Sequence, residues 1–168
     1  MPASAPVRAA IVVAALAALT AGYFWWNNPE RHIRRLLSDV ESALSHDGAE
    51  TDLLALAAVA SLQAHLTPDV AIEIGGSSPP VRGRQDVISM AARLRASSPM
   101  MRVQFFDPEI QLSDDSNATT RVTVQVTTRD AGGEELAAAH QVSIALVLVE
   151  GRWQVASARV LPDQDARL

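Results

Sequence analysis

Residues 137–149 and 153–161 read AAAHQVSIALVLV and WQVASARVL. Only Glu150, Gly151 and Arg152 separate these two stretches, and both are rich in Val, Leu and Ile that largely alternate with small or polar residues. Alternation is typical of strands with one buried face, and a three-residue connection that contains Gly is typical of a hairpin. The sequence therefore predicts an antiparallel hairpin near the C-terminus, on which the preceding elements pack.

Three helices are expected upstream of this hairpin. The tripeptide Asn28-Pro29-Glu30 is typical of a helix start, because it offers a capping side chain, a proline at the first position and an acid near the positive end of the dipole. Helical spacing of apolar residues predicts helices over 28–46, 49–66 and 84–96. The side of the second helix that is expected to face inward carries Leu53, Leu56, Ala57, Ala60 and Leu62.

The remaining segments have the pattern of strands. A short strand is expected at Val70–Ile74, and longer ones at Met101–Leu112 and Thr119–Thr128, with turn-like sequences between them. Helices followed by an antiparallel meander are typical of an α+β fold with the helices on one face of the sheet.

Composition excludes several classes of protein. A chain of 168 residues is long enough for one domain with a core, and aromatic residues make up only 4% of it, so Ala, Val and Leu must form that core. The net charge of −5 is spread along the chain, which argues against a nucleic-acid surface, since such a surface needs clustered positive charge. With no Cys, the chain has no disulfide and no cysteine nucleophile.

An uncharged segment near the N-terminus predicts a membrane anchor. Ala9–Trp26 contains no charged residue, and as a helix its eighteen positions would span about 27 Å, enough to cross the hydrocarbon core of a bilayer. The segment ends in an aromatic cluster of the kind that favours the headgroup layer, which consists of Tyr23, Phe24, Trp25 and Trp26. The alternative is a cleaved signal peptide. The expected organisation is a tail over 1–8, a transmembrane helix or signal anchor over 9–27, a folded domain over 28–162 and a tail over 163–168.

Two observations point to opposite sides of the membrane for the domain. Arg31, Arg34 and Arg35 follow the segment closely whereas only Arg8 precedes it, so the positive-inside rule favours a cytoplasmic domain. Single-span bacterial proteins of this plan commonly export their domain. We expect a single-pass protein of the bacterial inner membrane with the domain in the periplasm.

The order of these elements resembles the NTF2-like (SnoaL-like) superfamily. The resemblance covers about Glu30 to Leu161 and is carried by LTPDVAIEI (66–74), VRGRQDVISMAARL (81–94) and VEGRWQVASARV (149–160). It implies a cone in which three N-terminal helices pack on a curved antiparallel sheet. The preceding FWWNNPERHIRRLL (24–37) is similar to an uncharacterised bacterial branch in which such a domain is tethered to the membrane.

The resemblance also defines where a catalytic group is expected. Its enzymes, such as steroid isomerases, polyketide cyclases and dehydratases, use a carboxylate or His in the open end of the cone, and the isomerase base lies on or just after the first strand. Glu73 occupies that region here, but it alternates with Ile72 and Ile74 and is expected to face away from the core. His140 shares a strand face with Val142, and the other expected lining residues of such a pocket are Trp153, Phe105 and Met101.

Two arginines are candidates for contact with an anion. Arg82 and Arg84 flank Gly83 at the start of the third helix, where an anionic ligand could meet the helix N-terminus. No His or carboxylate pair shows the spacing of metal ligands, so neither a metal nor another cofactor is expected.

These observations favour a non-catalytic, membrane-anchored binding domain. Its expected role is that of an accessory or assembly subunit of a larger membrane complex, for example a respiratory or photosynthetic one. A homodimer is a further possibility, paired through the sheet face that carries Thr123, Gln125 and Ser143. The alternatives are a binding protein for a small apolar ligand and an enzyme that uses acid–base chemistry in the cone.

Overall fold

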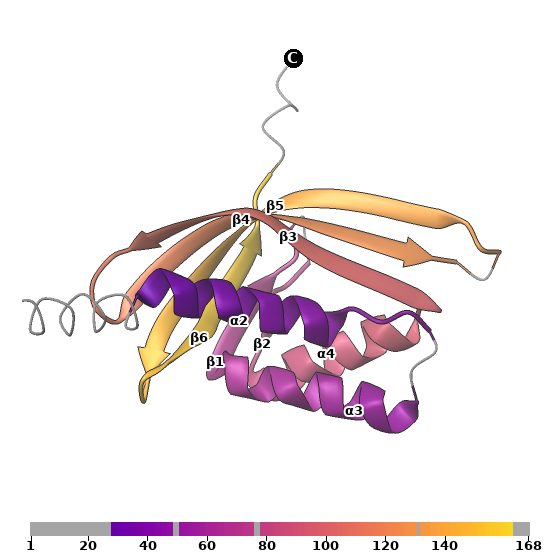
Figure 1. Cartoon of the computed structure of the whole chain (residues 1–168), viewed down its shortest axis with the longest axis horizontal. Coiled ribbons are helices and arrows are strands. Elements are labelled where there is room, and N and C mark those ends of the chain that lie inside the picture. Colours follow the sequence, from indigo (N-terminus) through magenta and orange to yellow (C-terminus); the bar gives the residue numbers. More distant parts are fainter. Residues whose placement is uncertain (1–27, 49–50, 76–77, 131, 163–168) are drawn as a thin grey trace, which may run out of the picture. The chain divides into compact units, whose positions relative to one another are not determined.

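The computed structural model describes residues 28–48, 51–75, 78–130 and 132–162. The chain divides into two units, Met1–His32 and Ile33–Leu168. The elements along the chain are α2 (Pro29–Leu44), α3 (Asp52–Ser61), the 3-10 turn η1 (Leu62–His65), β1 (Leu66–Glu73), β2 (Val81–Arg82), α4 (Arg84–Ala96), β3 (Met100–Leu112), β4 (Asn117–Arg129), β5 (Glu135–Val149) and β6 (Arg152–Val160) (Figure 1).

The six strands form one curved sheet with the order β2-β1-β6-β5-β4-β3. The predicted hairpin is confirmed, since β5 and β6 pair antiparallel from Val142↔Val160 to Val149↔Arg152. The expectation of a wholly antiparallel sheet is wrong at one position, because β1 pairs parallel with β6. Short turns impose antiparallel pairing on β3 through β6, whereas β1 is joined to β6 by no turn, and alternation along a strand does not encode its direction.

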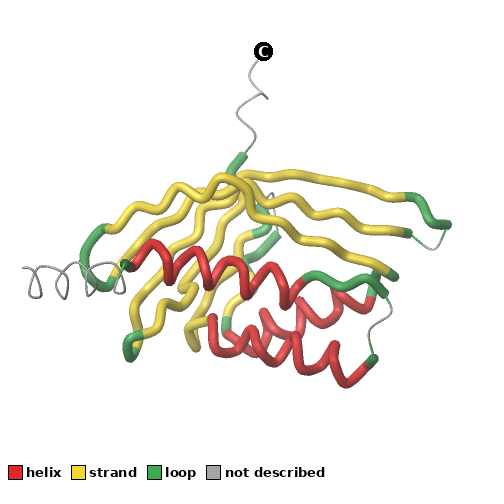
Figure 2. Tube along the Cα trace, in the orientation of Figure 1, coloured by secondary structure: helices red, strands yellow, loops and turns green. Residues whose placement is uncertain are grey.

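Helices cover one face of this sheet, and the core lies between the two layers (Figures 1 and 2). The most deeply buried side chains come from α2, β1, β3, β4 and β5. The largest of them are Ile33, Met101, Leu146, Val70, Val122 and Thr120. The core is therefore aliphatic, as the low aromatic content requires.

The second predicted helix differs from the structure in length and in orientation. It ends at Ser61, and the chain passes through η1 into β1, which begins at Leu66 rather than at Val70. Of the side expected to face inward, Leu62 is buried, but Leu53 and Leu56 are 76% and 68% exposed. Because α3 is apolar on every side, the spacing of its leucines does not identify the buried face.

The end of α2 covers the outer edge of β3. Glu41, Ser45 and His46 provide polar groups to the backbone of this edge strand. A carboxylate oxygen of Glu41 accepts from the N–H of Phe105 at 3.1 Å. The hydroxyl of Ser45 accepts from the N–H of Val103 at 2.9 Å and donates to its C=O at 3.2 Å. The backbone of His46 accepts from the N–H of Met101 at 3.0 Å and donates to its C=O at 2.7 Å. The N–H groups of three alternate residues on this edge, and the C=O groups of Met101 and Val103, thereby have hydrogen-bond partners.

Among the described residues, no helix is both long and apolar enough to cross a membrane. The predicted anchor over 9–27, with its cluster of Tyr23, Phe24, Trp25 and Trp26, lies outside the described residues, as does the tail over 163–168.

Candidate functional site

The space between the helices and the sheet, where any pocket of the cone would lie, is filled mainly by aliphatic side chains. Ile33 and Leu37 of α2 meet Val70 of β1 and Val122 of β4 in one buried cluster. A polar group that sequence reasoning missed lies on the same face of the sheet: Thr120 is fully buried, and its hydroxyl has no hydrogen-bond partner among the described residues. A lone hydroxyl can orient a ligand but cannot by itself serve as a base near neutral pH.

His140 lies at the open end of the sheet. Register places it beside Val124, which in turn pairs with Phe105, so the three side chains share the face that carries the core. Phe105 is partly buried and packs against the core, whereas His140 is exposed. Met101 is fully buried on β3, four residues before Phe105 and on the same face of that strand.

Trp153 lies at the opposite end of β5. It is buried and pairs with Leu148, which is eight residues from His140 along the strand. At the rise of a β-strand this separation is about 27 Å. The structure therefore puts Phe105 and His140 in one cross-strand row of the core-bearing face, about 10 Å apart. Met101 lies four residues, or about 13 Å, from Phe105 along β3, and Trp153 lies elsewhere in the core.

Glu73 lies on the outer face of the sheet, opposite to the core-packed Ile72. Its neighbour on β6 is Arg159, whose Nε and Nη2 donate to the two carboxylate oxygens at 2.5 and 3.2 Å. These hydrogen bonds, and the charge of Arg159, lower the pKa of the Glu73 carboxyl, and the charge of Arg82 lowers it further. A carboxylate held in its ionised form at the surface is poorly suited to act as a base at neutral pH.

We expect the titration of Glu73 to report this ion pair. Because the pKa is lowered in the folded state, the pair stabilises the fold above the ordinary pKa of a glutamate, and this contribution is lost as pH falls through the folded pKa. Replacing Arg159 by Met should raise the Glu73 midpoint in a carbon-13 NMR titration of the carboxyl group. Arg121 lies on the same outer row but is separated from Arg159 by Ser143 on β5, so Arg121→Met should leave the midpoint nearly unchanged. Equal shifts in the two variants would contradict this assignment.

The two arginines that were candidates for contact with an anion lie in different surroundings. Arg82 is exposed on the two-residue strand β2, on the side of Glu73. Arg84 begins α4 and borders an open pocket of about 410 Å³, which Arg152 and Gln154 also line. The Nε of Arg84 is buried and makes no hydrogen bond among the described residues. Two guanidinium groups at one pocket can hold an anion, although Glu150 also borders it.

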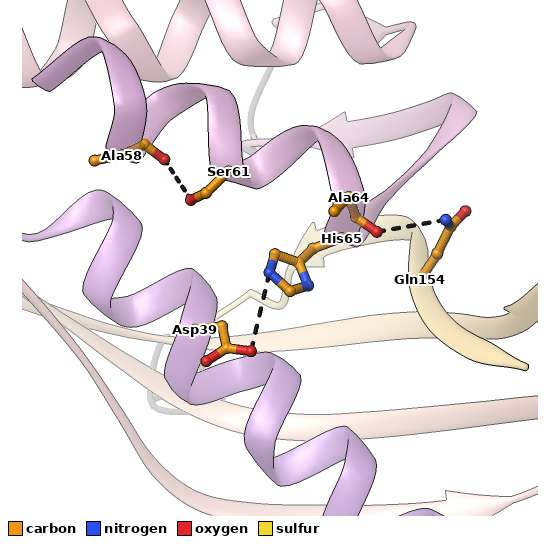
Figure 3. Close-up of polar contacts among 6 residues, drawn as sticks. All are labelled: Asp39, Ala58, Ser61, Ala64, His65 and Gln154. Carbon is orange, nitrogen blue, oxygen red and sulfur yellow. Dashed lines mark hydrogen bonds and ion pairs between the residues drawn. The ribbon is translucent and has the colours of Figure 1, made fainter. Parts of the chain in front are cut away.

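A group of polar contacts fixes η1 to its neighbours (Figure 3). His65 lies in η1, and its Nε2 is 4.0 Å from an oxygen of Asp39 on α2. Gln154 of β6 donates to the backbone oxygen of Ala64 at 3.4 Å. These contacts tie α2 and β6 to the same turn, so they have a structural role. Among the described residues, no three His, Asp or Glu side chains are grouped in a way that could hold a metal ion.

Sequence reasoning also missed Arg95, which is buried at the end of α4. Its Nη1 donates to the backbone oxygens of Ala43 and Ser45 at 2.7 and 2.9 Å. A signal was present, since Val87, Ala91 and Arg95 follow one another at intervals of four residues and so share one helix face.

Comparison with known proteins supports the fold. A family profile described as a SnoaL-like domain matches residues 52–159. A protein of Novosphingobium aromaticivorans that is provisionally named a scytalone dehydratase is similar in structure, with a TM-score of 0.66 and 16% identity over 79% of this chain and 82% of that one. Aln2 of a Streptomyces species has a TM-score of 0.60 and 15% identity, over 83% of this chain and 91% of that one. An uncharacterised protein of Caulobacter vibrioides with a cystatin-like fold has a TM-score of 0.61 and 14% identity, over 80% of this chain and 90% of that one. No curated protein matches the chain. At these identities the structural likeness shows the fold alone.

Proposed function

The chain belongs to the SnoaL-like domain family, and from that premise we propose that it is a non-catalytic, membrane-anchored domain that acts by binding. In this role it is an accessory or assembly subunit of a larger membrane complex, held beside its partners by a single helix over residues 9–27.

The placement of the ionisable candidates carries this proposal. Glu73 is paired with Arg159 on the outer face, and His140 is exposed at the end of the sheet. Glu41 is hydrogen-bonded to the backbone N–H of Phe105, which lies in the same cross-strand row as His140 but two strand spacings, or about 10 Å, away from it. General acid–base catalysis needs such groups within hydrogen-bond reach of one reacting atom, and these groups do not converge.

The sequence supports the anchor. The uncharged segment over 9–26 is long enough to span a bilayer and is rich in alanine, with Gly22 just before its aromatic cluster. Small residues of this kind allow membrane helices to approach one another closely, which suits a helix that packs on the spans of a partner.

A second candidate function is an enzyme that uses acid–base chemistry in the cone. It is favoured by one observation, the register that puts His140 on the core-bearing face beside Val124. The provisional name of the Novosphingobium protein belongs to the same class of chemistry. If this candidate holds, His140→Asn should abolish any dehydration of scytalone by the protein while leaving the unfolding transition unchanged.

Purification from native membranes tests the first proposal. The full chain should sediment with membranes and, after extraction in mild detergent, migrate on a native gel in a constant ratio with other membrane proteins. A variant that begins at Asn28 is the control and should be lost from that complex. Recovery of the full-length gene product as a lone soluble monomer that lacks the residues before Gly22 would contradict the proposal.

A further inference from the structure

Helix α3 presents its largest apolar side chains to the outside. Leu53, Leu54 and Leu56 are 76%, 57% and 68% exposed, and between residues 53 and 61 only Val59 is buried. The residues that face the domain are small, whereas those that face away are leucines. This is the reverse of the arrangement that burial of a surface helix ordinarily produces.

Helical geometry shows that the outward residues form one continuous face. At about 100° per residue, Leu53, Leu54 and Leu56 fall within an arc of about 160°, and the exposed Ala57 and Ala60 lie inside the same arc. Val59 falls on the opposite side. Residues 53–61 contain no charged side chain. Ser61 is the one polar residue inside this arc. The outward face is therefore wide and largely apolar, unlike the narrow stripe that packs against a single partner helix.

The apolar face continues toward α4. Leu56 borders an open groove of about 430 Å³ between the two helices, whose lining includes Ala55, Val59, Ala92 and Ala96. The far side of the groove is polar in part, since His46, Arg95 and Ser98 also line it. We name the outward face of α3, together with the alanine-lined side of the groove, the α3 surface.

We propose that the α3 surface lies on the lipid bilayer, with its leucines in contact with the acyl chains. This inference rests on the proposed function, because it requires residues 9–27 to be a membrane anchor. The uncharged segment ends at Trp26 and α2 begins at Pro29, so only two residues, at most about 7 Å of chain, separate the expected span from the domain. A domain on so short a tether rests one of its faces on the bilayer, and the α3 surface is chemically suited to that contact.

Its composition favours lipid over a protein partner. Protein interfaces derive most of their affinity from Trp, Tyr and Arg anchors, and leucine is under-represented among them. Residues 53–61 of α3 contain neither an aromatic residue nor an arginine. Leucine and alanine side chains gain from transfer into hydrocarbon without needing a shaped partner.

The absence of cysteine from the chain allows a direct test in the full-length protein. Leu54→Cys and Leu136→Cys form a matched pair, because these leucines are 57% and 58% exposed but lie on α3 and on β5. Each variant is labelled with the fluorophore NBD and reconstituted into vesicles of phosphatidylcholine and phosphatidylglycerol that carry a nitroxide lipid. We expect the label at residue 54 to emit at shorter wavelength and to be quenched about twofold more than the label at residue 136.

Flotation of the same vesicles separates the two hypotheses. If the protein floats, but the label at residue 54 emits at the same wavelength and is quenched as weakly as the label at residue 136, the bilayer contact is overturned and the anchor is retained. If the protein does not float, the anchor is overturned and the bilayer contact with it. If the label at residue 54 emits at shorter wavelength but is not quenched by the nitroxide lipid, the bilayer contact is also overturned, because protein then covers the α3 surface.

Discussion

Replacing Leu146 by alanine is expected to lower the free energy of unfolding by about 3 kcal/mol. Leu146 lies in the last third of β5, is 1% exposed, and has Ala118 and Val155 as its neighbours on β4 and β6. Truncation removes apolar contacts and leaves a cavity in the core, which strands fixed on both sides cannot close. Chemical denaturation followed by circular dichroism measures the change.

The same strand offers the control for this substitution. Leu136 also lies on β5 but is 58% exposed, so Leu136→Ala should change the free energy of unfolding by no more than about 0.5 kcal/mol. An equal decrease in the free energy of unfolding of the two variants would contradict the register of β5, and with it the position of the core.

Replacing Arg95 by methionine is expected to lower the free energy of unfolding by a similar amount, about 3 kcal/mol. Methionine preserves much of the apolar stem but removes the guanidinium that donates to the backbone oxygens of Ala43 and Ser45. These oxygens lie at the carboxyl end of α2, where a cation also interacts favourably with the helix dipole. Without the guanidinium, they lose a charged donor inside the protein.

Arg93 provides the matched control on α4. It is exposed two residues away, so Arg93→Met removes the same charge from the same helix turn without removing these contacts. We expect Arg93→Met to change stability by less than about 0.5 kcal/mol. If Arg95→Met were equally mild, the link between α4 and α2 would contribute little to the fold.

The sequence was sufficient to predict those elements whose local pattern agrees with their environment. The β5–β6 hairpin follows from alternation and a short turn, and α4 begins at Arg84 and ends at Ala96 as its apolar spacing predicts. Helix α3 could not be oriented, because leucine or alanine occupies every side of it. The parallel pairing of Ala71 with Ser157 could not be predicted either, since it depends on how distant segments meet.

The site was less accessible to sequence reasoning than the fold. That Glu73 faces Arg159 depends on the register between strands 86 residues apart, and nothing local to either residue indicates it. The distance between His140 and Trp153 depends on the full length of β5, so two residues from one predicted hairpin lie at opposite ends of the sheet. Arg95 could have been found, because its interval from Val87 and Ala91 places it on the buried face.

The cover that α2 gives to β3 has a consequence for solubility at high local concentration. An uncovered long edge strand can recruit the edge of another molecule and start a fibril. Here Glu41, Ser45 and His46 already occupy the N–H groups of Phe105, Val103 and Met101 and the C=O groups of the last two. The irregular register between Phe106 and Glu109 interrupts the strand beyond them. Many copies can thus crowd together without polymerising through this flank of the molecule.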